Sequence, residues 1–166
     1  VQISPGDGTA DVIQIEAGQK TAPNLVKLLQ DKAITKIFHF GRFDLAVLAH
    51  AFGTMPEPVF CTKIASKLTR TYTDRHGLKA ICGELLDVSI SKQQQSSDWA
   101  AEVLSQAQLE YAASDVLYLH RLKAVFEQRL ERDGRTKQAE ACFKFLPTRS
   151  ELDLMGWPDT DIFAHA

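Results

Sequence analysis

The sequence predicts an α/β domain in which a mixed central sheet is flanked by helices. Short alternating or β-branched runs in the first part of the chain are bounded by Gly, Pro or Asp, which is typical of strands. Longer stretches with apolar residues at helical spacing separate these runs and then fill the second half of the chain. We find no internal repeat and no linker, so the 166 residues are expected to form a single domain, 1–166.

The predicted elements follow one another in a regular order. Residues 1–4 and 11–15 alternate on either side of the turn-forming cluster 5–9, which predicts a β-hairpin. The first of these runs begins directly at Val1, so we expect an N-terminally incomplete domain that lacks its first strand. The other predicted elements are a helix over 23–30, a strand over 34–40, a helix over 43–52, a strand over 59–62, and helices from 63 onward, over 76–86 and within 105–130.

Composition excludes several classes of protein. A net charge of −2 argues against a tight grip on long nucleic acid, because such a grip uses many Lys and Arg contacts to phosphates. The three cysteines lack CxxC spacing, which indicates neither a zinc site nor a disulfide framework. No apolar run is long enough to predict a membrane span, and no leader sequence is evident, so we expect a cytoplasmic protein.

Three residues carry the chemistry that the sequence suggests. Tyr111 precedes Asp115 by one helical turn, so the phenol and the carboxylate are expected on one helix face. Asp44 follows a predicted strand at the start of a helix, where the helix dipole favours its negative charge. Each residue alone also fits an ordinary role, as a helix-start acid, a packed ring or a solvated acid.

Ordered motifs around these residues resemble a known family. Residues 39–44, HFGRFD, resemble the second motif of the DEDD-type 3′–5′ exonucleases, and residues 111–115, YAASD, resemble the third motif of their tyrosine-containing, ribonuclease D-like branch. Between them, LDVSISK at 86–92 and SDW at 97–99 resemble the ribonuclease D pattern in order and spacing. The resemblance implies a ribonuclease H-like exonuclease fold.

The resemblance is closest to the nano-RNase C family, compact bacterial members of this branch. It includes GDGTAD at 6–11, FCTK at 60–63 and GW at 156–157, and it runs from end to end of the chain. It implies an enzyme that hydrolyses short single-stranded RNA, down to dinucleotides, from the 3′ end to nucleoside 5′-monophosphates. It also implies a homo-oligomeric ring.

The same resemblance implies a metal site. In this family four carboxylates hold two divalent ions, and oxygen ligands suit Mg²⁺ or Mn²⁺. Asp44 and Asp115 would supply two of the four carboxylates, and Tyr111 would orient the attacking water. These three residues are therefore the expected catalytic residues, and the two aspartates are the expected metal ligands.

The sequence departs from the family pattern at two places. The first motif, Asp-x-Glu on the opening strand, is absent in a strand context, and we expect it upstream of Val1. Phe40 stands where many relatives carry Asn. The missing motif leaves a second hypothesis open, namely a catalytically inactive nucleic-acid-binding or scaffolding domain of the same fold.

Several further residues are candidates for substrate contacts. Lys63, Lys67 and Arg70 repeat at spacings of four and three, which gives either a phosphate-facing strip or an ordinary solvated helix face. Trp99 could stack on a base or serve the fold alone. The expected substrate-binding residues are Phe43, Lys63, Arg70, Lys92, Gln95 and Trp99.

Overall fold

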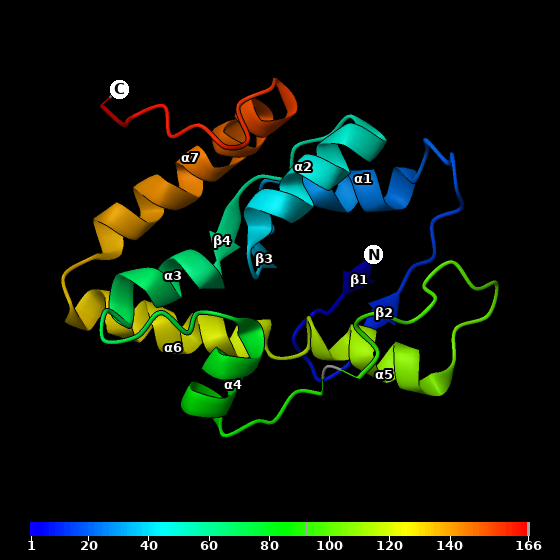
Figure 1. The fold of residues 1–166 in the computed structure, drawn as a ribbon, viewed down its shortest axis with the longest axis horizontal. Helices are drawn as coiled ribbons and strands as arrows, with labels where there is room; N and C mark the ends of the chain where they lie inside the picture. Colours follow the sequence, from blue (N-terminus) through cyan, green and yellow to red (C-terminus); the bar gives the residue numbers. More distant parts are fainter. Residues whose placement is uncertain (92, 166) are drawn as a thin grey trace.

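A computed structural model describes residues 1–91 and 93–165 and confirms the α/β class. Helices surround two small strand pairs (Figure 1). The elements in chain order are β1 Gln2–Ile3, β2 Asp11–Val12, α1 Pro23–Gln30, β3 Lys36–Phe38, α2 Gly41–Phe52, β4 Val59–Cys61, α3 Thr62–Thr69, α4 Leu78–Leu86, α5 Gln106–Ser114, α6 Leu119–Arg132 and α7 Thr136–Leu154.

The strands form two separate pairs. The predicted hairpin is confirmed, because β1 and β2 pair in antiparallel fashion with Gln2 opposite Val12. Strands β3 and β4 pair in parallel, and α2 makes the connection between them. The strands are therefore mixed in direction, as predicted, although in the described part of the chain they do not join into one continuous sheet. A mostly apolar cleft of about 490 Å³ is lined by residues of both pairs.

Helix α2 begins earlier than the sequence suggested, at Gly41 instead of residue 43. Phe40, which follows β3, adopts the left-handed conformation with a φ of 64°. This conformation turns the chain from β3 into helix α2. Gly41 is required at the first helical position because a Cβ there would lie 2.9 Å from the Cβ of Phe38. This tight turn places Asp44 in the first turn of α2.

The helical stretch that we expected within residues 105–130 is interrupted. Helix α5 ends at Ser114 and α6 starts at Leu119. The Ser114 hydroxyl donates to the carbonyl oxygen of Tyr111 at 2.7 Å, and the next amides make tight bonds three residues back, including Val116 to Ala113 at 3.1 Å. A serine hydroxyl that competes for a helical carbonyl weakens the regular ladder, which explains the break.

The core lies among the helices of the second half and strand β4. Leu45, Ile81, Leu122 and Phe126 are fully buried there. Helix α7 runs back past β4 and α2 (Figure 1), which brings the C-terminal segment to the start of α2. None of the helices within the described residues is long and apolar enough to span a membrane.

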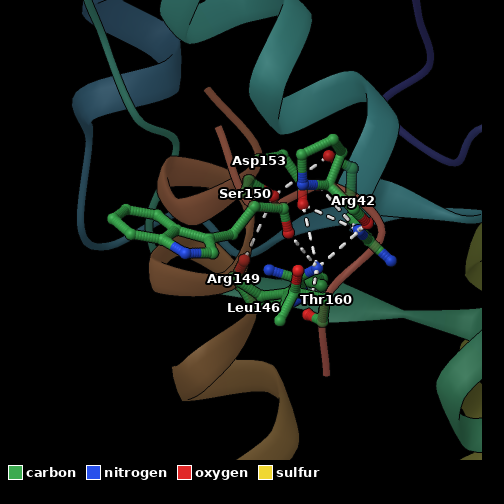
Figure 2. A network of polar contacts seen from close by, with 8 residues as sticks. Arg42, Leu146, Arg149, Ser150, Asp153 and Thr160 are labelled. Atoms are coloured by element: carbon green, nitrogen blue, oxygen red, sulfur yellow. Dashed lines mark hydrogen bonds and ion pairs between the residues drawn. The ribbon is translucent and has the colours of Figure 1, made fainter. Parts of the chain in front are cut away.

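A network of hydrogen bonds and an ion pair connects α7 to α2. The Arg42 guanidinium donates to both carboxylate oxygens of Asp153, at 2.6 and 2.7 Å. The Ser150 hydroxyl donates to the Arg42 carbonyl oxygen at 3.0 Å, and Arg149 donates to the Thr160 carbonyl oxygen at 3.3 Å (Figure 2). Arg42, two residues before Asp44, is thus fixed to α7.

Candidate active site

Two aspartates from distant parts of the chain come together at the candidate site. Asp44 lies in the first turn of α2, and Asp115 is the residue that caps the C-terminal end of α5. Both are half-buried. The negative charge of Asp115 opposes ionisation of Asp44 and raises its pKa, so the two carboxylates lie within electrostatic reach of each other.

The electrostatics of these acids differ from the simple helix-start expectation. Burial raises the pKa of Asp44 to about 6; a hydrogen bond to its own backbone partly opposes this shift, and Asp115 adds to it. Burial also raises the pKa of Asp115. Desolvation therefore outweighs the favourable helix dipole at Asp44. A cation bound between these two carboxylates would stabilise their ionised forms, so the pair is suited to act as metal ligands.

Tyr111 lies beside Asp115 as the spacing predicted. Burial and the negative charge of Asp115 both raise the pKa of the Tyr111 phenol, which keeps this group protonated at neutral pH. The Trp99 ring lies against the Tyr111 ring, with centroids 5.8 Å apart and an interplanar angle of 44°. Trp99 is 38% exposed. It therefore packs on the candidate catalytic tyrosine while keeping one part of its ring in solvent.

The segment before Asp44 is held by α3. The His39 Nδ1 atom lies 3.0 Å from the Thr62 hydroxyl, and burial together with the positive charge of Lys63 lowers the pKa of His39 to about 4. The Lys63 ammonium lies over the Phe40 ring, 4.1 Å from its centroid. The left-handed conformation of Phe40 is one that Asn adopts more readily, which accounts for the residue expected from the family pattern.

A cavity opens on the tyrosine and the second aspartate. Its volume is about 910 Å³, within the range of small-molecule sites. Tyr111, Asp115 and Gln95 line one side, and residues of the segment 70–79 and of α4 line the other. The sequence reasoning missed Tyr72 and Glu84 on this far side, because only folding brings these positions together.

Arg70 differs from its predicted role. Its side chain is 1% exposed, and it follows the end of α3 instead of extending a basic helical face. It forms a salt bridge with Glu84 and donates to the Arg75 carbonyl oxygen at 2.6 Å. We therefore assign Arg70 to the internal framework and not to direct phosphate binding.

The other predicted substrate residues have varied positions. Phe43 is 63% exposed on α2, next to Asp44. Lys63 is half-buried, and Gln95 lies on the cavity wall. Lys92 lies outside the described residues.

The donor set fits part of a divalent-cation site. Carboxylate oxygens are the ligands that Mg²⁺ and Mn²⁺ prefer, and Asp44 and Asp115 provide two such groups with raised pKa values. Among the residues that the structure describes, no group of three or more His, Cys, Asp or Glu side chains gathers as a metal site. This part of the chain thus offers two candidate ligands.

Comparison with known proteins places this site in a family. The family described as 3′–5′ exonuclease matches residues 1–131. The chain belongs to the ribonuclease D-like 3′–5′ exonucleases. Ribonuclease D of Gluconacetobacter diazotrophicus is 36% identical over 135 residues, which cover 81% of this chain and 34% of that protein. The chain thus spans about a third of the length of this curated relative.

Solved structures agree with this family and with the narrower resemblance. Brucella melitensis NrnC with bound Mg²⁺ is 90% identical, with a TM-score of 0.96, and the match covers 99% of this chain and 80% of that chain. The same protein bound to pGG gives 92% identity, a TM-score of 0.96 and the same coverage. Escherichia coli RNase D is 30% identical, with a TM-score of 0.71, over 81% of this chain and 36% of that chain. The predicted similarity to nano-RNase C is confirmed.

Proposed function

We propose that this protein is a metal-dependent 3′–5′ exoribonuclease that hydrolyses short RNA, down to dinucleotides, to nucleoside 5′-monophosphates. The observation that carries the proposal is the meeting of Asp44 and Asp115 beside Tyr111, with burial opposing the charge of both acids. The binding of pGG by the similar Brucella protein supports a dinucleotide substrate, and its bound Mg²⁺ supports a divalent cation.

The roles of the site residues follow from their chemistry. Asp44 and Asp115 would hold Mg²⁺ or Mn²⁺, two ions in the complete site, which supply charge neutralisation and an acidified water. The protonated Tyr111 phenol is suited to donate a hydrogen bond that orients a water or a phosphate oxygen. Trp99 packs against this tyrosine and restricts its ring, while Phe43, Lys63 and Gln95 are proposed to contact the nucleotides.

A second function is favoured by one observation. Only two carboxylates meet at this site among the described residues, and this is fewer than the family's four. A domain with this donor set could bind nucleic acid or act as a scaffold without hydrolysing its ligand. The two functions make different predictions, because a binding domain retains its ligand unchanged.

The test is cleavage of a 5′-labelled RNA dinucleotide and of an RNA heptanucleotide by the full-length gene product. The reaction is run with Mg²⁺, with Mn²⁺ and with EDTA, and Asp115→Ala serves as the inactive control. Metal-dependent loss of both RNAs, absent in the variant, is the expected result. Binding of intact RNA without cleavage would favour the scaffolding function instead.

We also propose that the protein forms a homo-oligomeric ring and lies in the cytoplasm. Several large apolar side chains near the end of the chain are exposed, which is consistent with a surface that a second copy covers; they are Met155, Trp157 and Phe163. The molar mass in solution, measured by light scattering, tests the oligomer. A purely monomeric species at micromolar concentration would contradict it.

A further inference from the structure

The far wall of the cavity that opens on Tyr111 and Asp115 is built around a buried arginine. Arg70 lines this wall although its side chain is only 1% exposed. Its Nε donates to a carboxylate oxygen of Glu84 at 3.1 Å, and its Nη2 forms the second arm of the pair. This two-armed contact joins the end of α3 to α4.

The same guanidinium holds the loop between the two helices. Its Nη1 donates to the Ser66 hydroxyl at 3.1 Å and to the Arg75 carbonyl oxygen at 2.6 Å. The Arg75 amide also donates to the Thr73 hydroxyl, at 3.2 Å. The backbone at Arg75 is therefore fixed from the interior as well as within its own turn.

This wall contains the ion pair of the buried Arg70 and two basic side chains that are exposed to the cavity. Hydrogen bonds from Arg70 and Tyr72 lower the pKa of Glu84 to about 2, so Glu84 is charged and neutralises Arg70. Arg75 and Lys79 line the same cavity with exposed side chains. Neither forms a salt bridge with a partner in ranges 1–91 and 93–165, so both ammonium and guanidinium groups are available to a phosphate, although the acid Asp87 also lines this cavity.

We propose that Arg70 is a positioning residue that holds Arg75 and the segment 71–77 in place. This segment forms the cavity wall that a short RNA contacts with a part of the molecule other than its scissile phosphate. The proposal rests on the proposed function and adds the residues that grip the non-reacting part of the substrate. A cation on a backbone that is already fixed binds a phosphate with less loss of conformational entropy than one on a free loop. Because this wall does not touch the reacting atoms, it binds the ground state and the transition state equally.

The decisive variants are Arg70→Lys, Arg75→Gln and the two combined. Lysine keeps the positive charge of Arg70 but cannot reach Glu84 and the Arg75 carbonyl oxygen together. We expect the KM for an RNA dinucleotide to rise at least about tenfold in each single variant, with kcat within about twofold of the parent. The double variant should be little worse than either single one, because both changes remove the same contact.

A matched control comes from another structural arginine. Arg135 donates from Nη1 to the Leu68 carbonyl oxygen, and so supports α3 from inside without lining the cavity. Arg135→Lys should lower the thermal midpoint and leave the KM unchanged. If Arg70→Lys behaved in the same way, its role would be purely structural and the proposal would be overturned.

Affinity for the unlabelled dinucleotide, measured by calorimetry with and without divalent cation, separates this proposal from the proposed function. Hydrolysis by the parent with an unchanged KM in Arg70→Lys would overturn the positioning role alone. Binding without hydrolysis by the parent would overturn the enzymatic function. A higher dissociation constant in Arg70→Lys than in the parent would then still support the positioning role of Arg70. A parent that neither binds nor cleaves the dinucleotide would overturn both.

Discussion

The start of helix α2 carries two acid-containing regions with opposite electrostatics. In the first, the Arg42 guanidinium pairs with Asp153 and holds the pKa of that carboxyl below its usual value. In the second, two positions further along, Asp44 faces Asp115, and its pKa is raised to about 6. The paired acid stabilises the packing of α7, whereas Asp44 and Asp115 form no salt bridge within residues 1–91 and 93–165 and are the candidates to bind a cation. An acid whose charge the fold leaves uncompensated is the better candidate for chemistry.

The largest effect is expected from removing one of the unpaired acids. Asp115→Ala should lower turnover of an RNA dinucleotide at least about a thousandfold, because it removes a ligand to the ion that neutralises the reacting phosphate. The thermal midpoint should not fall. Single-turnover assays and a melting curve measure the two outcomes.

The control for this change is Glu110→Ala, an exposed acid on the same helix. It should retain normal turnover. Near-normal activity of Asp115→Ala would remove the aspartate from the metal site and end the distinction between the two regions.

The paired region should respond in stability and not in chemistry. Arg42→Ala removes two charge-assisted hydrogen bonds to Asp153 and should lower the free energy of unfolding by about 2 kcal/mol, since the half-buried carboxylate keeps only the longer contact with Arg149, at 3.2 Å. Urea denaturation measures this change. In contrast, Arg132→Ala removes a pair with Asp133 on the open surface and should leave stability unaltered. Equal effects of the two variants would contradict the structural role of the Arg42 network.

The stability that Asp44 contributes should fall as pH rises. The folded-state pKa of Asp44, about 6, lies above its unfolded value of ~3.9, so this group stabilises the fold below ~3.9 and loses that contribution as pH rises through about 6. Without divalent cation, Asp44→Asn should therefore be more stable than the parent by about 2 kcal/mol at pH 7, and the difference should vanish near pH 4.

The difference between variant and parent is the quantity to measure, because His39 acts in the opposite direction. Its folded pKa of about 4 lies below the usual value, so its contribution is present at neutral pH and is lost on acidification. Guanidinium titrations of both proteins at several pH values cancel this common term. A constant difference across this pH range would refute the raised pKa of Asp44.

The smallest effect is expected at the tyrosine. Tyr111→Phe keeps the ring that packs against Trp99 and removes only the hydroxyl. Turnover should fall about tenfold, the magnitude of one lost hydrogen bond in a transition state, while affinity for divalent cation stays the same. Loss of cation affinity, measured by calorimetry, would give the hydroxyl a role in binding the ion instead.

The sequence alone determined the features that depend on local periodicity and on motif order. The helix 23–30, the hairpin and the strand at 59–61 lie where alternation and helical spacing predicted them. The motif residues Asp44, Tyr111 and Asp115 were also identified, because their residue types and order resemble one family. Local pattern suffices for these features, since hydrophobic periodicity and turn residues act within a few positions.

Only the tertiary structure decided which charges are compensated. Nothing near Arg42 in the sequence indicates Asp153, and nothing near Arg70 distinguishes it from an exposed basic residue. The pKa of Asp44 likewise depends on burial and on Asp115, which are set by the packing of α2 against distant segments. Desolvation and long-range pairing arise only when elements far apart in the chain come together, so a linear pattern cannot specify them.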